Sequence, residues 1–532
     1  MRKQLSVLFG LLLLVLFLTD CAKRGRPTGG DKDEDAPLLE KSFPANYSTN
    51  FKGKELKLIF DEYVKLKDVN TQLIISPPLK NSPLITPIGT ASKTITIKIL
   101  DTLKENTTYS FNFGQSVTDN NEGNIFNNFK FVFSTGPIID SLIINGNIKD
   151  AFNKKTDENV TVMLYEINEA FKDSVIYKEK PYYVGNTLDS TVWEITNIKA
   201  GEYLLMALGD KSKNYTFDPK EDKIGFEQKN ITIPTDSSYS IKLFKEILPF
   251  RFTRPFEVSK GHIQFGYEGL ADSIKIEPLS VIPDFKSVSS FEKDKDTLNY
   301  FFKGSVADSI QFKVSNRRVI DTVIVKLRSK KVDTLRLTKL NSSEFQLKNQ
   351  LKILSNLPLA SVDTTKIDFF DQDTISVKYD MKISEDKSEL IFDFEKKYDQ
   401  KYSMEILPNS IFNFFEQSND TLKYKFSTKK VEDYGKLFVT LKGVQKFPII
   451  VQLLSSKEKI VQEIYAIEEQ QYDFIDLLPG KYFLRVIYDE NENKIWDTGN
   501  FLRKEQPEKV IYLEFTNDVR ANWEMPESFI LE

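Results

Sequence analysis

The chain has 532 residues and carries 73 Lys and Arg against 77 Asp and Glu, a formal net charge of −4. This length exceeds what one hydrophobic core usually supports, so the sequence predicts several domains. A single His and a single Cys exclude most zinc sites, Cys–His nucleophile pairs and iron–sulfur clusters within one chain. The slightly acidic balance argues against nucleic acid as a partner.

The N-terminus predicts export. Arg2 and Lys3 precede an apolar stretch from Leu5 to Leu18, which has the length of a secretory signal and is short for a stable membrane span. Residues 1–20 are therefore predicted to be a signal peptide.

The segment Leu18-Thr19-Asp20-Cys21 resembles a bacterial lipobox, although Asp20 replaces the small residue that this motif prefers. The resemblance implies that Cys21 is lipidated and holds the protein on a membrane through acyl chains. The alternative is a structural thiol at Cys21. Residues 21–36 are too polar to bury a core and are expected to form a flexible tether.

The rest of the chain is predicted to be all-β. Apolar and other residues alternate with period two, and polar turn clusters separate these runs. The clearest runs are 94–99, 109–113, 129–133 and 322–327. Because no amphipathic helix of about twelve residues is evident, the pattern predicts a series of antiparallel β-sandwiches.

Two internal repeats refine this prediction. Residues 56–68 align without gaps onto 351–363, and 133–135 (Phe-Ser-Thr) align with 426–428. Residues 200–218 align with 479–497 at one constant offset. We therefore expect two pairs of related domains.

Residues 37–137 resemble an SbsA-type bacterial Ig-like domain. The residues that carry this resemblance are Ser42 to Asn46, Leu58 to Glu62, Ile74 to Pro78, Leu103 to Tyr109, Val117 to Asp119, Gly123, Asn124 and Phe133 to Gly136. The family implies a β-sandwich that serves as a spacer or interaction module, with no catalytic role. Residues 344–431 resemble a degenerate second copy.

Residues 138–248 and 432–532 are similar to prealbumin-like (carboxypeptidase-regulatory-like) β-sandwiches, through the Gly-x-Tyr hairpins at Gly201 and Gly480. Residues 249–343 are predicted to be a β-sandwich of unassigned type. The whole arrangement resembles exported Ig-like-domain lipoproteins of diderm bacteria, which implies an outer-membrane lipoprotein that faces the periplasm or the cell surface.

One loop has the spacing of a calcium site. Oxygen-bearing side chains stand at positions one, three, five and nine in Asp489, Asn491, Asn493 and Asp497. The alternative is a polar turn in which these side chains bind the backbone. The repeat keeps the spacing with fewer charges in its own copy, at Asp210, Ser212, Asn214 and Asp218. No other cofactor is expected.

Catalytic candidates are few. Paired acids suffice for glycoside hydrolysis, but Asp61-Glu62 and Glu221-Asp222 are expected to be solvated. His262 alternates with apolar neighbours and is expected on the polar face of a strand, without a catalytic partner. We therefore expect that the protein is not an enzyme, with a polysaccharide-acting enzyme as the least favoured reading.

Two aromatic clusters leave a binding function open. Tyr182-Tyr183 with Trp193, and Phe412 to Phe415, would stack on sugars if they were exposed, or fill cores if they were buried. The sequence thus predicts a lipid-anchored envelope protein that acts as spacer, scaffold or adhesion element. The alternative is a surface glycan-binding protein, and the partners would be the membrane, envelope proteins or glycans.

Overall fold

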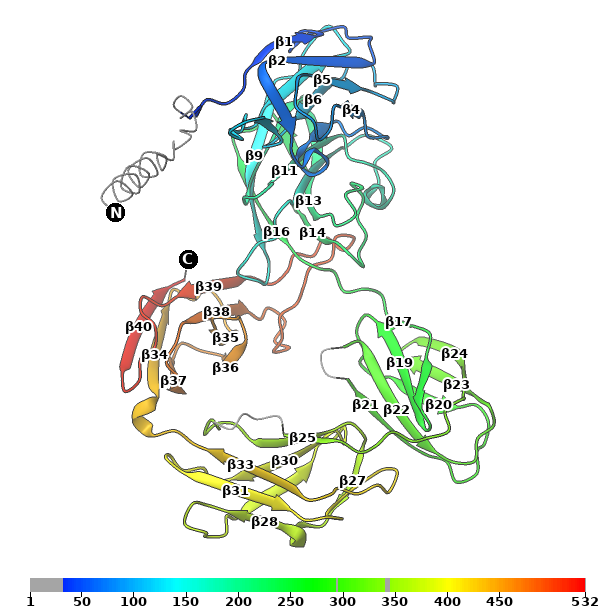
Figure 1. Ribbon diagram of the computed structural model, residues 1–532, viewed down its shortest axis with the longest axis vertical. Helices are drawn as coiled ribbons and strands as arrows, with labels where there is room; N and C mark the ends of the chain where they lie inside the picture. Colours follow the sequence, from blue (N-terminus) through cyan, green and yellow to red (C-terminus); the bar gives the residue numbers. More distant parts are fainter. Residues whose placement is uncertain (1–31, 293–294, 340–344, 532) are drawn as a thin grey trace, which may run out of the picture. The chain divides into compact units, whose positions relative to one another are not determined.

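The computed structural model describes residues 32–292, 295–339 and 345–531, and these residues form an all-β protein (Figure 1). The α-helix of this part of the chain is the single turn α2 (Val69–Gln72), and its 3₁₀ helices are equally short. The all-β prediction is confirmed. The predicted signal peptide, Cys21 and most of the tether lie outside the described residues. No helix among the described residues is long and apolar enough to cross a membrane.

Contacts divide the chain into two compact units. Unit 1 comprises Met1–Ile143, Tyr182–Leu188 and Ile195–Ala200, and unit 2 comprises Ile144–Pro181, Asp189–Glu194 and Gly201–Glu532. In chain order the strands form five groups, which we call the first to fifth sandwiches. The first lies in unit 1, and the third, fourth and fifth lie in unit 2.

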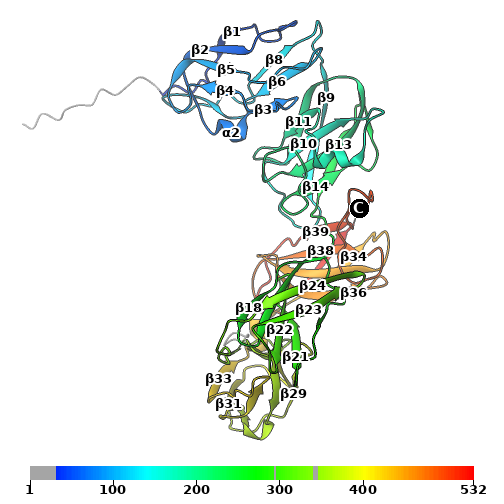
Figure 2. The same cartoon turned by 90° about the vertical axis from the view of Figure 1, so that its right-hand side faces the viewer.

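The first sandwich packs a sheet of order β1-β2-β5-β4, with β7 paired to β2, against a sheet of order β3-β6-β8 (Figure 2). Its strands are β1 (Leu39–Phe43), β2 (Glu55–Leu66), β3 (Ile74–Ser76), β4 (Leu84–Thr86), β5 (Ser92–Lys98), β6 (Thr108–Asn112), β7 (Val117–Asp119) and β8 (Lys130–Ser134). Leu56, Leu58 and Phe60 alternate along β2 and are fully buried in the core. The end of the predicted tether is held here, because the Asn124 amide donates to the carbonyls of Asp33 and Asp35.

The fourth sandwich repeats this topology, with sheets of order β25-β26-β30-β29 and β28-β31-β33 and the pair β27-β32. Its strands are β25 (Leu337–Lys339), β26 (Leu351–Ser355), β27 (Leu359–Val362), β28 (Ile367–Phe370), β29 (Tyr379–Ile383), β30 (Glu389–Phe394), β31 (Lys401–Ile406), β32 (Ile411–Asn413) and β33 (Leu422–Ser427). Strands β26 and β27 together occupy the place of the long β2. The strand is interrupted where Pro358, which has no N–H for the ladder, aligns with Tyr63.

A shared hydrogen-bonded corner supports the kinship of these two sandwiches. In the first, the hydroxyl of Thr135 accepts from the Thr107 N–H at 3.0 Å and donates to the Lys104 carbonyl at 2.7 Å. In the fourth, Thr428 makes the same two bonds, at 3.0 Å and 2.5 Å. In the fourth sandwich the partners of Thr428 are the Gln400 N–H and the Lys397 carbonyl, which correspond to Thr107 and Lys104 in the first. The sequence repeat therefore marks a repeat of structure.

The second and fifth sandwiches also share a topology. The strands of the second are β9 (Leu142–Asp150), β10 (Thr161–Glu166), β11 (Tyr183–Asn186), β12 (Val192–Ile198), β13 (Gly201–Gly209), β14 (Lys223–Phe226), β15 (Ile231–Ile233) and β16 (Ser238–Leu243). The strands of the fifth are β34 (Gly435–Lys442), β35 (Ile449–Ser455), β36 (Ile460–Ala466), β37 (Gln471–Leu477), β38 (Tyr482–Tyr488), β39 (Val510–Glu514) and β40 (Glu524–Ile530). The antiparallel run β10-β13-β14 corresponds to β35-β38-β39, and each sandwich has one parallel pair, β9 with β16 and β34 with β40.

The third sandwich consists of two sheets. One has the order β17-β19-β22-β21, with β18 also paired to β19, and the other has the order β20-β23-β24. Its strands are β17 (Arg251–Phe252), β18 (Phe256–Ser259), β19 (His262–Glu268), β20 (Lys275–Pro278), β21 (Lys286–Phe291), β22 (Thr297–Lys303), β23 (Ser309–Asn316) and β24 (Val319–Lys326). Ile263 and Phe265 of β19 pack with Phe312 of β23 in a core of its own.

Candidate functional site

The candidate calcium loop follows β38 directly, and one buried carboxylate, that of Asp489, organises its backbone. Asp489 is 1% exposed, and its two oxygens accept the backbone N–H groups of Asn493 at 3.1 Å and Lys494 at 2.8 Å. Lys494 has φ of +67° and Glu492 has φ of +63°. These left-handed residues fold the chain around the carboxylate, as in an Asx-type turn.

The other predicted ligands lie in the same loop and bind each other. The side-chain amides of Asn491 and Asn493 donate to one oxygen of Asp497, at 2.7 Å and 2.6 Å. Their own oxygens accept from the backbone N–H groups of Asn493 and Ile495. The structure therefore brings the four residues together in the hydrogen bonding of a polar turn.

To bind a cation, these oxygens would have to give up the hydrogen bonds that they accept from N–H groups and coordinate the ion instead. Oxygen-rich loops of this composition suit a hard cation such as calcium. Among the described residues, no group of three or more His, Cys, Asp or Glu side chains is placed to hold a metal ion. The calcium site stays a prediction.

The first copy of the loop has the same backbone. Asp210 accepts from the N–H groups of Asn214 at 3.3 Å and Tyr215 at 2.8 Å. Left-handed φ values recur at Lys213 (+54°) and Tyr215 (+62°), at the positions equivalent to Glu492 and Lys494. Ser212 is exposed, and Asp218 accepts from the Lys220 N–H at 2.9 Å.

A second acid, which the alignment of the two repeats does not include, completes both loops. Glu508 accepts from the N–H groups of Glu490 at 2.7 Å and Asp497 at 3.0 Å. Asp222 accepts from the equivalent N–H groups of Lys211 and Asp218, at 3.1 Å and 2.9 Å. Burial raises the pKa of both carboxyls, although the donated N–H groups oppose the rise. The equivalence of Asp222 and Glu508 could not be read from the repeat, because the two acids stand at different distances from the aligned residues.

The pair Glu221-Asp222 therefore departs from expectation. Asp222 is 1% exposed, where the sequence predicts a solvated side chain, because its carboxylate bonds the backbone of its own loop. Asp61 and Glu62 lie inside β2, because that strand continues to Leu66. Asp61 is exposed and accepts from the Leu38 N–H at 2.8 Å, so it has a structural role.

The first aromatic cluster fills cores. Trp193 and Tyr183 are 1% and 2% exposed. The half-buried Tyr182 has the Lys104 ammonium over its ring, 4.5 Å from the centroid. The core interpretation is confirmed for Trp193 and Tyr183, and neither ring can stack on a sugar.

The second aromatic cluster lies at a junction between sandwiches. Phe415 meets Phe301 of the third sandwich edge-on, at 6.4 Å between ring centroids. A Cβ at Gly261 would lie 2.8 Å from the Phe415 ring, so only glycine permits this approach. Lys303 lies over Phe414 at 5.2 Å and forms an ion pair with Glu416 at 2.7 Å. These rings pack against protein instead of forming an open platform.

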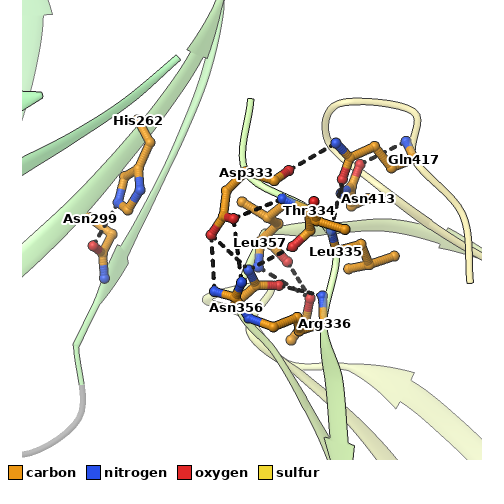
Figure 3. Close-up of polar contacts among 11 residues, drawn as sticks. His262, Asn299, Asp333, Thr334, Leu335, Arg336, Asn356, Leu357, Asn413 and Gln417 are labelled. Atoms are coloured by element: carbon orange, nitrogen blue, oxygen red, sulfur yellow. Dashed lines mark hydrogen bonds and ion pairs between the residues drawn. The ribbon is translucent and has the colours of Figure 1, made fainter. Parts of the chain in front are cut away.

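His262 lies on the face of β19 opposite the core residue Ile263, as expected, but that face is covered. Its ring stacks on Phe301 at 4.2 Å, and its Nε2 hydrogen-bonds the Asn299 side-chain oxygen at 2.8 Å. Because an amide oxygen accepts, Nε2 carries the proton. Burial lowers the pKa of His262, so the ring is neutral at pH 7. Figure 3 shows His262 and Asn299 apart from the polar network around Asp333.

That network fixes the segment that leads into the fourth sandwich (Figure 3). The Asp333 carboxylate accepts from the Asn356 amide at 3.1 Å and pairs with Arg336 at 3.0 Å. Gln417 donates to the Asp333 carbonyl at 2.9 Å and accepts from the Leu335 N–H at 3.0 Å. The partners named here are side-chain amides, backbone groups and one Arg. Such groups hold a segment in place and do not act as general acids or bases at neutral pH.

Comparison with known proteins bears on the first sandwich. Residues 33–135 match the family model of a bacterial Ig-like domain. This match supports the Ig-like assignment of that sandwich. No curated protein matches the chain.

Comparison with solved structures gives matches of low identity and low TM-score. The S-layer protein rSbsC(31-844) has 12% identity and a TM-score of 0.16, covering 91% of this chain and 67% of that one. The TIE protein of Bacillus anthracis has 11% identity and a TM-score of 0.16, covering 95% and 76%. BcpA, the major pilin subunit of Bacillus cereus, has 12% identity and a TM-score of 0.14, covering 73% and 99%. At TM-scores this low, the likeness supports no conclusion about this chain.

Proposed function

We propose that the chain is a lipid-anchored cell-envelope protein whose β-sandwiches act as a spacer or scaffold. Residues 33–135 match a bacterial Ig-like domain, and the strands that follow form further sandwiches with separate cores. Cys21 would carry the lipid and residues 22–32 would separate the first sandwich from the bilayer.

The observation that carries this proposal is the placement of the aromatic side chains. A glycan-binding sandwich needs an exposed row of rings, whereas Trp193 and Tyr183 are buried and Phe414 and Phe415 pack on the third sandwich. The scaffold function is therefore favoured over glycan binding at these two clusters.

We also propose that the protein is not an enzyme. His262 faces an amide and an aromatic ring, and in the described part of the chain its hydrogen-bond partner is the Asn299 amide, which cannot form a nucleophile–base pair with it. The buried acids Asp222 and Glu508 bond backbone N–H groups of their own loops. Both oxygens of each carboxylate accept backbone N–H groups, so these acids stabilise turns.

The anchor is tested by fractionating cells that express Cys21→Ala, with Thr28→Ala in the tether as the matched control. We expect the control to stay with membranes and to incorporate labelled fatty acid, and the Cys21 variant to lose both properties. Membrane recovery of Cys21→Ala at the control level would refute lipid anchoring.

Protease treatment of intact and lysed cells, with an epitope at the C-terminus, then separates two forms of the proposal. Digestion on intact cells would place the sandwiches outside and support an adhesion role. Protection until lysis would place them in the periplasm and support an internal scaffold.

A further inference from the structure

The fifth sandwich carries an insertion that its copy lacks. In the second sandwich, four positions separate Asp218 from the buried Asp222, whereas eleven separate Asp497 from the equivalent Glu508. We call residues 498–506 the arm. Asn500 and Glu505 exchange both backbone hydrogen bonds, at 2.9 and 3.0 Å, so the arm is a closed turn.

The tip of the arm is buried in the second sandwich. Phe501 is 0% exposed, and its ring meets Phe226 of β14 edge-on at 5.2 Å. Its backbone N–H donates to the Glu246 carboxylate at 2.5 Å. A Cβ at Gly499 would lie 2.7 Å from the Phe244 ring, so glycine is needed where the arm approaches.

Polar contacts surround this apolar centre. The Thr498 hydroxyl donates to the Lys245 carbonyl at 2.7 Å, and the Gln506 amide donates to the Phe226 carbonyl at 2.9 Å. Lys504 forms an ion pair with Asp173 at 2.6 Å. An apolar anchor ringed by paired polar groups is the usual anatomy of a specific interface.

The second sandwich contributes a reciprocal anchor from the loop after β9. The Phe152 ring contacts the Trp496 ring, at 4.6 Å between centroids, and the Arg485 guanidinium, at 4.1 Å from the Phe152 centroid. The Tyr512 hydroxyl donates to the Phe152 carbonyl at 2.8 Å. Each sandwich therefore contributes one Phe to the contact, of which Phe501 is buried and Phe152 is half-buried.

We propose that the arm is an intrachain clasp, which docks the fifth sandwich on the second and makes the third and fourth sandwiches an insertion between two joined domains. The insertion is present in only one copy of the repeat, and it supplies Phe501 as well as partners for Glu246, Asp173 and the Phe226 carbonyl. The inference rests on the proposed scaffold function and deepens it, because the clasp would hold the second and fifth sandwiches at a fixed separation, whereas without the clasp that separation would vary. Its test uses the purified protein and does not depend on the lipid anchor.

Zero-length crosslinking of the full chain with a carbodiimide tests the clasp. We expect an amide between Lys504 and Asp173, identified by peptide mass spectrometry in the monomer band. The ion pair of Lys352 with Glu389 at 2.9 Å, inside the fourth sandwich, is the positive control. Phe501→Asp should lower the Lys504–Asp173 product at least tenfold, and Leu502→Ala, at the 56% exposed neighbouring position, should leave it unchanged.

The outcomes are distinct. The core cluster of the fifth sandwich does not include Phe501, so Phe501→Asp should keep the exchange protection of β34 and β38 while the radius of gyration rises. Absence of the Lys504–Asp173 product in the wild type, with the control product present, would overturn the clasp. A product confined to the dimer band would also overturn it, because the arm would then dock on a second copy.

Discussion

The corner at Thr428 offers a quantitative test of the fourth sandwich. Thr428→Val keeps the shape of the side chain and removes the hydroxyl that accepts from Gln400 and donates to the Lys397 carbonyl. Two neutral hydrogen bonds contribute about 1–3 kcal/mol at about 0.5–1.5 kcal/mol each. Since each 1.4 kcal/mol is tenfold, local opening should become about 5- to 150-fold more frequent.

Hydrogen exchange on the full chain, read on peptides of β31, measures this opening without requiring the whole protein to unfold in one step. Tyr424→Phe is the matched control, because it also removes one hydroxyl in the same sandwich. The Tyr424 hydroxyl is buried and has no hydrogen-bond partner in the described structure, so its loss should be neutral or stabilising. If Tyr424→Phe accelerates exchange as much as Thr428→Val, the reasoning about the corner is wrong.

Further predictions concern single residues. Burial lowers the pKa of His262 below its unfolded value near 6.5, so its stabilising contribution is complete above pH 6.5 and declines as the pH falls further. The protection factors of the β19 amides, which are intrinsic exchange rates divided by the observed rates at the same pH, should fall as the pH is lowered from 6.5 to 5, and His262→Gln should remove that decrease. Trp193→Ala should cost about 3–5 kcal/mol by urea unfolding followed through the second sandwich, whereas Trp523→Ala, at a 52% exposed site, should change stability by less than about 0.5 kcal/mol. If the loop binds calcium, a concentration of about 100 times Kd should stabilise the fifth sandwich by about 2.7 kcal/mol, and Asp489→Asn with Asp497→Asn should abolish both the stabilisation and the heat of binding; equal melting with and without the ion would favour the polar turn.

Local patterns were sufficient for much of the fold. The run 94–99 predicted β5, and 322–327 predicted the end of β24, because alternate side chains of a strand face opposite sides. The constant offset between residues 200–218 and 479–497 predicted two loops whose carboxylates bond equivalent N–H groups. The strands depend on the period of side chains along the chain and the loops on hydrogen bonds between near neighbours, so the local sequence contains both.

Alternation was less informative where both faces of a strand are covered. Phe131, Val132 and Phe133 of β8 are all buried, because residues 46–51 run along that strand and bond it. Asp222 was expected in solvent because it is an acid in a probable loop. It is buried because its loop folds back and donates backbone N–H groups to its carboxylate. Neither outcome follows from the type of residue alone.

The sequence by itself determined the β-strand pattern, the internal repeats and the turn chemistry of the Asp210 and Asp489 loops. Only the tertiary structure decided that His262 is covered and that Phe501 is buried against Phe226. These contacts join residues that are far apart in the chain, Phe501 and Phe226 by more than 250 positions. The local sequence pattern does not predict such contacts. A Phe or a polar turn can lie in solvent, in a core or at an interface, and only the packing of the sandwiches decides which.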